Sequence, residues 1–179
     1  MSFVVDQLWR QAVKSMRGER LEALEFAAAG AADDRARALR DGARGGIRGG
    51  KKNPAIMRCA ARSADETPTA GAFRPAEITL PDSSVDVRRF RPDLVVAKAD
   101  AEGFVEGTRV ERTLRAGEVE FACEASCPHC AMATHGFADL PRDTRVMRLL
   151  VRENGSDLDA CTRVTRPDVV HRGDTVSIF

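Results

Sequence analysis

A two-residue alternation of apolar and polar side chains through residues 118–125 constrains the fold of this chain more than any other feature. Val119, Phe121 and Cys123 fall on one face of the segment, while glutamates and one alanine fall on the other. A period of two is typical of a β-strand with one buried face. The sequence therefore predicts a strand here, and that strand leads directly into the most cysteine-rich part of the chain.

Other strand patterns lie toward both ends of the chain. The first 26 residues predict two strands around a turn near Arg17-Gly18, and residues 94–96 form a short apolar run typical of a buried strand. The C-terminus predicts strands at 169–170 and around Val176, with a turn between them. We expect a mainly β fold.

One helix is expected among these strands. Residues 143–153 carry Val146, Leu149 and Leu150 at helical spacing, after Pro141 and Asp143 as start signals. The predicted fold class is therefore mainly β with α additions (α+β).

Charge and composition exclude several classes of function. The chain has 28 Lys and Arg against 27 Asp and Glu, whereas a dedicated nucleic-acid binder usually carries a clear basic excess. No apolar run is long enough to span a membrane, and the N-terminus lacks a signal-peptide pattern. We expect a cytoplasmic protein with no membrane partner, and nucleic acid is not an expected partner. The five cysteines are then expected to be reduced thiols.

Basic side chains are concentrated between Arg35 and Lys52, where seven Lys and Arg accompany a single acid, Asp41. Such a segment either faces an anion or is solvated. Residues 42–54 are glycine-rich and predict a loop. Its two Arg-Gly-Gly copies, within 43–53, resemble an RNA-binding repeat, but a phosphate-facing or mobile loop is favoured for so few copies.

The densest group of reactive side chains is Ser126-Cys127-Pro128-His129-Cys130, followed by Thr134 and His135. The Cys127-x-x-Cys130 spacing suits a redox pair. The same cysteines with nearby histidines suit zinc. A single thiolate here can also hold a soft metal or accept sulfur. Against these stands the possibility that some of these cysteines are only small buried side chains.

Several motifs in a consistent order resemble the MOSC domain family, the molybdenum cofactor sulfurase C-terminal domain. They are RRFRPDLVV at 88–96, GFVEGTRVERTLRAGEVEF at 103–121, CPHCAMATHGFADLPRD at 127–143 and RGDTVSIF at 172–179. The opening LWRQAVKSMRGERLEALEF, at 8–26, resembles the N-terminal β-barrel half that accompanies many of these domains. The pattern is similar to that of bacterial relatives of the mitochondrial amidoxime-reducing component, with a shortened middle.

The resemblance implies two small β-barrel-like halves, with the MOSC-type barrel in the C-terminal half. Residues 62–78 contain two prolines and little periodicity, which favours a boundary there. We predict an N-terminal half over 1–61, a linker or shortened middle over 62–84 and a MOSC domain over 85–179.

The resemblance also implies a molybdenum cofactor (molybdopterin) held by Cys130 as metal ligand. Cys127, Thr134 and His135 are then further candidate catalytic residues. Anion-binding positions of the family correspond to Lys14-Ser15, Asp34-Arg35 and Phe90-Arg91-Pro92. The predicted cofactor-binding residues are Lys14, Ser15, Asp34, Arg35, Arg88, Arg89, Arg91 and Asp93.

The function implied is a molybdenum-dependent oxidoreductase that removes oxygen from N-hydroxylated small molecules, with a redox protein as electron donor. An alternative is a sulfur carrier that uses a Cys130 persulfide, supplied by a cysteine desulfurase, without molybdenum. A second alternative is a shortened, cofactor-free member with a diverged enzymatic or binding role.

Three acids bear on how tightly the cofactor would bind. Asp33, Asp34 and Asp93 place negative charge beside the expected phosphate site. Two like charges at about 4 Å repel by roughly 4 kcal/mol at an effective dielectric constant of about 20. The sequence therefore predicts a weakened anion site, unless arginines neutralise these acids.

Overall fold

The computed structural model of the chain describes residues 3–40, 46–48, 50–51, 54–59, 72–75, 78–80, 83–97, 106–136 and 139–179. Over these residues the protein consists mostly of strands, with one α-helix, α1 (Arg145–Asn154). The prediction of a mainly β fold with α additions is confirmed.

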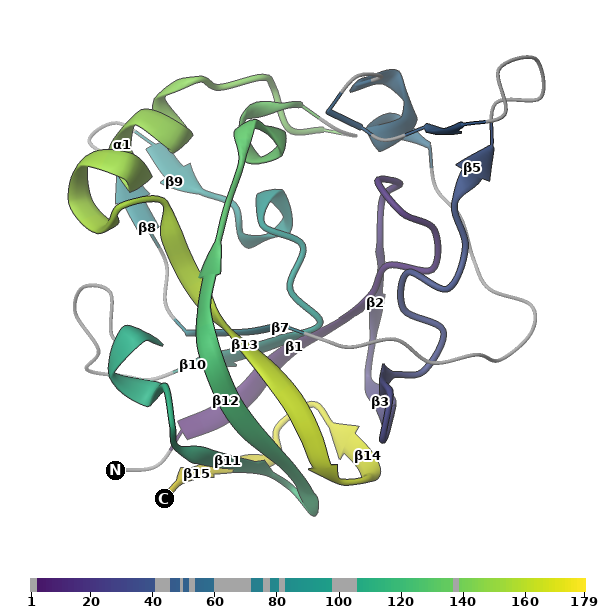
Figure 1. Cartoon of the computed structure of the whole chain (residues 1–179), viewed down its shortest axis with the longest axis vertical. Helices are drawn as coiled ribbons and strands as arrows, with labels where there is room; N and C mark the ends of the chain where they lie inside the picture. The colour runs from purple at the N-terminus through teal and green to yellow at the C-terminus, as the bar shows by residue number, and fades with distance from the viewer. Residues whose placement is uncertain are drawn as a thin grey trace.

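Seven strands of the described residues form a closed ring (Figure 1). Each is hydrogen-bonded to the next in the order β1, β10, β7, β13, β12, β11, β15, and β15 pairs back onto β1. In chain order they are β1 (Phe3–Arg10), β7 (Ala72–Pro75), β10 (Leu94–Ala97), β11 (Thr113–Ala116), β12 (Val119–Pro128), β13 (Asp157–Arg166) and β15 (Thr175–Ile178). Only the β10–β7 pairing in this ring is parallel. Closure satisfies the backbone groups that an open sheet edge would expose.

Shorter elements surround the ring. A three-stranded sheet has the order β14-β3-β4, and two further pairs are β5–β6 and β8–β9. The strands outside the ring are β2 (Glu19–Leu21), β3 (Ala23–Ala27), β4 (Gly30–Ala31), β5 (Leu39–Arg40), β6 (Ile47–Arg48), β8 (Ile78–Leu80), β9 (Ser83–Val85) and β14 (Asp168–His171). The 3-10 helices are η1 (Pro54–Arg58), η2 (Val87–Arg89), η3 (Glu106–Arg109) and η4 (Ala131–Thr134).

The barrel core consists of inward-facing side chains from most of the ring strands and from the β14-β3-β4 sheet. Leu8 and Leu114 are fully buried in it, and full burial of a leucine stabilises the fold by about 1.5–3 kcal/mol. Phe26 of β3 packs edge-on against Phe121 of β12, with ring centroids 5.0 Å apart. This contact attaches the small sheet to the ring.

The strand predicted at 118–125 is present and extends further, as β12, to Pro128. Val119, Phe121 and Cys123 are buried, as the alternation predicts. Beyond Cys123 the pairing with β13 becomes irregular, with register shifts at Cys123/Ala125 and Ser126/Pro128. Such bulges bend a strand and re-aim its side chains, and here they direct the end of β12 toward the barrel end where α1 lies (Figure 1).

The predicted helix at 143–153 is confirmed as α1, which begins two residues later than expected. The Asp143 carboxylate accepts a hydrogen bond from the backbone N–H of Arg145 at 2.9 Å, so it caps the first turn. Val146 and Leu150 bury one face of the helix against Leu158 and Phe90. This second, smaller cluster supports the loop that follows β12.

The structure is more complex than expected in two regions, the loop at 42–54 and the division at 62–84. The glycine-rich loop expected over 42–54 contains the short strand β6, which pairs with β5, and part of η1; the rest of 43–53 lies largely outside the described residues. The predicted division at 62–84 stays a prediction. Within it, β7 joins the ring, and the ring contains strands from both sides of that division, because β1 pairs with both β10 and β15.

Candidate functional site

The predicted site residues are found on loops at the barrel end where β12 terminates and α1 lies (Figure 1). The turn after β1, the segment around Arg35, the residues after η2 and the end of β12 meet there. We call this the α1 end.

Arg35, itself half-buried, is the centre of a charge cluster with two buried acids. Its Nη1 lies 2.6 Å from Asp34 Oδ2 and 3.3 Å from Asp93 Oδ2, and both carboxylates are completely buried. Its Nη2 donates to the Arg91 carbonyl at 2.8 Å. The Asp93 charge raises the pKa of Arg35 above its ordinary value, with a further contribution from Asp34. The guanidinium is therefore fixed as a cation.

The turn that carries Lys14 and Ser15 is attached to this cluster through the backbone. Lys14 N–H donates to the Arg37 carbonyl at 2.8 Å, and Arg35 N–H donates to the Gln11 carbonyl at 2.9 Å. The Gln11 N–H donates to Asp34 Oδ1 at 2.6 Å. Lys14 is exposed, whereas Ser15 is buried. Hydrogen bonds thus tie residues 11–15 to residues 34–37.

Arg91 crosses to the same turn from the other side. Its Nη1 donates to the Met16 carbonyl. Its Nη2 atom is buried and has no hydrogen-bond acceptor within the described ranges. Burial, and then the Arg35 charge, lower the pKa of Arg91 to about 10, so it remains cationic at neutral pH. A buried donor on a charged side chain is costly to leave unused unless an anion binds it.

The backbone around the cluster is strained. Seven non-glycine residues in the described part of the chain have positive φ, and Ser15, Asp33, Arg35 and Arg91, with φ between 49° and 68°, belong to this region. Left-handed conformations are unfavourable for residues with a Cβ atom and gather at functional sites. The concentration of strain here supports a binding role for these loops.

The three acids that were expected to weaken the phosphate site each lie close to an arginine. Asp34 and Asp93 both contact Arg35, and Asp33 lies 4.0 Å from Arg10 and 3.9 Å from Arg37. The repulsion expected from the sequence is thus opposed by arginines within the fold.

Two thiols lie beside Arg35. Cys127 at the end of β12 and Cys161 on β13 are half-buried on paired strands. Hydrogen bonding from Cys127 lowers the pKa of the Cys161 thiol to about 7 and raises the pKa of Cys127, whose burial adds to the rise. His129 approaches from the same strand end, with Nε2 3.1 Å from Asp159 Oδ2 and its ring 4.9 Å from that of Phe90.

Cys130 itself is exposed and has an extended backbone directly before η4. Its carbonyl accepts the Ala133 N–H at 3.1 Å. Thr134 is buried and donates its hydroxyl to the Ala131 carbonyl at 2.6 Å, while His135, half-buried, ends the turn. The cysteine thus stands at the start of a tightly hydrogen-bonded loop.

Glycine 50 connects the basic segment to this loop. A Cβ atom on Gly50 would lie 2.8 Å from Met57 and 3.2 Å from Met132 of η4. The Arg17 N–H in turn donates to the Cys59 carbonyl at 2.9 Å. Gly50 therefore lies against the Cys130 loop, and Cys59 holds the turn after β1.

Arg88 and Arg89 have partners within the protein. Arg89 donates to the carbonyls of His135 and Pro141, at 3.4 and 2.7 Å, and so clamps the loop after Cys130. Arg88 pairs with Asp86 at 2.6 Å and Asp139 at 2.9 Å. Their predicted part in cofactor binding stays a prediction, and the structure gives both a role in shaping the loops.

The α1 end therefore brings together most of the predicted residues, and the ring contact between Phe90, next to Arg91, and His129, next to Cys130, connects the charge cluster to the Cys130 loop. The prediction placed Lys14, Ser15, Asp34, Arg35, Arg91 and Asp93 in one site, and the contacts above join them. Sequence reasoning did not single out Cys161 or Asp159, because only the β12–β13 register brings them to the site. Within the described residues no group of three or more metal-binding side chains is assembled.

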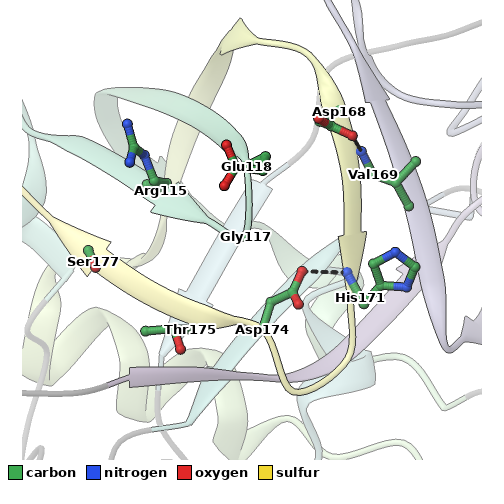
Figure 2. A pocket seen from close by; sticks show the side chains of 9 residues that line it. All are labelled: Arg115, Gly117, Glu118, Asp168, Val169, His171, Asp174, Thr175 and Ser177. Atoms are coloured by element: carbon green, nitrogen blue, oxygen red, sulfur yellow. Dashed lines mark hydrogen bonds between the residues drawn. The ribbon is translucent and has the colours of Figure 1, made fainter.

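A hollow of about 520 Å³ lies at the opposite end of the barrel between the β11–β12 turn, β14 and β15 (Figure 2). Its acids already have partners. Asp168 accepts from Val169 N–H at 2.7 Å, Asp174 accepts from His171 N–H at 2.8 Å, and Glu118 pairs with Arg166 at 2.9 Å. We assign no chemistry to this hollow.

Comparison with known proteins agrees with the architecture. The family model described as MOSC domain matches residues 50–177, so the chain belongs to the MOSC domain family. The structure is similar to that of the YUAD protein from Bacillus subtilis, with a TM-score of 0.64 and 14% identity, over 99% of this chain and 96% of that one. It is also similar to the crystal structure of a hypothetical protein, with a TM-score of 0.55 and 11% identity, over 99% of this chain and 67% of that one. At these identities the likeness concerns the fold alone.

A search of the curated proteins gives no match. In the part of the chain that the structure describes, no helix has the length and apolar character needed to cross a membrane.

Proposed function

We propose that the α1 end binds a molybdenum cofactor and that the protein is an oxidoreductase acting on N-hydroxylated or related N-oxygenated small molecules. The observation that carries the proposal is Arg91, a half-buried arginine whose Nη2 atom is buried and lacks an acceptor within the described residues. MOSC domains are associated with this cofactor, and its phosphate is an anion that suits such a donor.

The residues present fit the two ends of the cofactor. Arg91 and Arg35, with the backbone of the Lys14-Ser15 turn, would hold the phosphate. Cys130 would hold the metal, since its sulfur is exposed and cysteine sulfur is a soft ligand suited to a sulfur-rich metal site. When bound, the cofactor supplies the two-electron chemistry that removes oxygen from nitrogen.

The chain's own residues would position the substrate and move protons. Arg89 clamps the loop after Cys130, and the Thr134 hydroxyl closes its first turn. His135 ends the same turn and is our candidate for the proton donor, because an imidazole can deliver the proton that a departing oxygen requires. A redox protein would supply electrons at the exposed face of this loop.

The test is metal and pterin content after expression in a molybdate-fed host that makes the cofactor. We expect near-stoichiometric molybdenum, lost in Cys130→Ala and retained in Cys59→Ala, which removes another exposed thiol. Wild-type protein without molybdenum would contradict the proposal. A loaded protein that fails to reduce an amidoxime with a chemical electron donor would contradict the proposed reaction but not the site.

The exposure of Cys130 also favours a second candidate function. A partner such as a cysteine desulfurase can reach an exposed thiol and transfer sulfur to it as a persulfide. Metal-free protein that accumulates cyanolysable sulfur on Cys130 would support this carrier role. If the purified protein carries neither molybdenum nor sulfur on Cys130, the result would favour the second alternative, a cofactor-free member with a diverged role.

A further inference from the structure

A hollow away from the α1 end is lined by cations and apolar side chains. It has a volume of about 530 Å³ and lies where the start of β1, η3 with the loop that follows it, and the end of β15 meet; β15 and α1 lie at opposite ends of the molecule (Figure 1). The residues that line it are Phe3, Thr108, Arg109, Arg112 and Ile178, and no Asp or Glu is among these described residues. We call it the η3 hollow, and the proposed cofactor chemistry does not use it.

The two arginines of the η3 hollow are held in place by the backbone of β12. Arg112 N–H donates to the Arg109 carbonyl at 3.0 Å, and the Arg112 carbonyl accepts the Cys123 N–H at 2.9 Å. The Cys123 carbonyl in turn accepts the Glu111 N–H at 2.9 Å. The backbone that carries both guanidiniums is therefore fixed before a ligand binds, which reduces the entropy lost on binding.

Neither guanidinium is neutralised within the protein. In the part of the chain that the structure describes, Arg109 and Arg112 have no ion pair and no side-chain hydrogen bond. Three arginines on the neighbouring strands β11 and β13 do pair with acids, at 2.6–2.9 Å: Arg115 with Glu120, Arg163 with Glu124 and Arg166 with Glu118. The η3 hollow thus holds positive charge that the fold leaves uncompensated, and this favours an anionic ligand.

Apolar surface lies directly beside this charge. The Arg109 guanidinium carbon is 5.3 Å from the centroid of the Phe3 ring. A cation–π contact of this kind uses the charge of the guanidinium but none of its N–H donors. Ile178 is half-buried, so part of its side chain still faces the hollow. The hollow therefore offers unused donors next to an apolar wall.

We propose that the η3 hollow binds a small amphiphilic anion, a carboxylate that carries an apolar chain. The Arg109 and Arg112 guanidiniums would hold the carboxylate, because the planar guanidinium matches a carboxylate with two parallel hydrogen bonds. The chain would lie against Ile178 and Phe3, where it is removed from water. Such a ligand contacts β1 and β15 at once, so its binding stabilises the closed barrel.

The test uses octanoate as the probe and the full chain as the protein. We expect octanoate to bind at least about tenfold more tightly than octanamide, which lacks the charge, and than acetate, which lacks the chain. Isothermal titration calorimetry measures the affinities, and the NMR signals of the Ile178 methyl groups should shift on binding. Octanoate that fails to bind, or octanamide of equal affinity, would overturn the proposal. Equal affinity for acetate would show a general anion site and would overturn it too.

Variants provide the matched controls. Arg109→Gln and Arg112→Gln should each weaken octanoate binding by at least about tenfold, whereas Arg152→Gln, which changes an exposed arginine of α1, should leave it unchanged. Cys130→Ala should bind octanoate normally, which distinguishes this proposal from any failure of cofactor binding. The Ile178 shift is measured on the wild-type protein, so the test stands even if a variant folds poorly. Undiminished affinity in both arginine variants would refute the assignment.

Discussion

Arg91 donates a hydrogen bond to the backbone carbonyl of Met16, 75 residues earlier in the chain. Through this bond the residues after η2 hold the turn that carries Lys14 and Ser15. The second nitrogen of the same guanidinium is left without an acceptor in the described structure. One side chain thus both positions the turn that carries Lys14 and Ser15 and places positive charge at the α1 end.

Replacement of Arg91 should therefore weaken cofactor binding while leaving the stability of the fold nearly unchanged. Arg91→Met retains much of the apolar volume but removes the charge, and we expect molybdenum content to fall at least tenfold. The free energy of unfolding should change by less than about 1.5 kcal/mol, because one hydrogen bond is lost while an unpaired buried donor is relieved. Metal analysis and urea denaturation measure the two effects. Arg115→Met, at the far end of the barrel, serves as control.

The Arg35 cluster should contribute measurably to stability. Asp93→Asn removes a completely buried carboxylate 3.3 Å from Arg35, and we expect a loss of about 1–3 kcal/mol, since a hydrogen bond to a charged group is weakened inside the protein. Chemical denaturation monitored by Trp9 fluorescence measures it. Glu124→Gln breaks an exposed pair with Arg163 and should cost less than about 1 kcal/mol. Equal losses of stability in the two variants would show that the Arg35 cluster contributes no more than an exposed ion pair.

Cys161 should react with alkylating agents at neutral pH. The hydrogen bond from Cys127 lowers the pKa of Cys161 to about 7, so its thiolate, and with it the alkylation rate, should rise through that pH and level off above it. Cys127→Ala removes the donor, and the midpoint should move up toward the ordinary thiol value of about 8.5. Rates measured by mass spectrometry of the 153–163 peptide test this. An unchanged midpoint would show that Cys127 does not stabilise the thiolate.

The end of α1 offers a test of backbone conformation. Gly155 has a φ of 60°, and no atom lies within 4 Å of the Cβ that a substitution would add. Gly155→Ala should therefore destabilise the protein by about 1–2 kcal/mol through the left-handed backbone alone. Gly46→Ala, which likewise meets no atom within 4 Å and has no positive φ, should have little effect. Thermal denaturation of the two variants gives the comparison.

Local patterns predicted the elements well. The alternation at 118–125 identified β12, and the spacing of Val146 and Leu150 identified α1, because each signal lies within a few consecutive residues. The boundaries shifted where tertiary contacts decide: β12 extends to Pro128 because it continues to pair with β13 through its bulges.

The site was only partly accessible from sequence. Motif resemblance indicated Arg35 and Arg91 as members of one site, yet the partnership of Cys127 with Cys161 depends on a strand register that no local pattern encodes. The left-handed backbone of Ser15 and Arg91 was equally hidden, since neither residue type signals positive φ. The tertiary structure imposes both.

Closure of the barrel has a consequence for how the protein is made. Phe3 and Val4 of β1 pair with Val176 and Thr175 of β15, so the ring cannot close on a ribosome until β15, the last of its strands in the sequence, has emerged. Contacts between residues so far apart in sequence are slow to form, because the entropy of a long loop is lost before the contact stabilises it. We expect the nascent chain to expose unpaired strands until β15 is available, and its yield in cells to depend on chaperones that shield them.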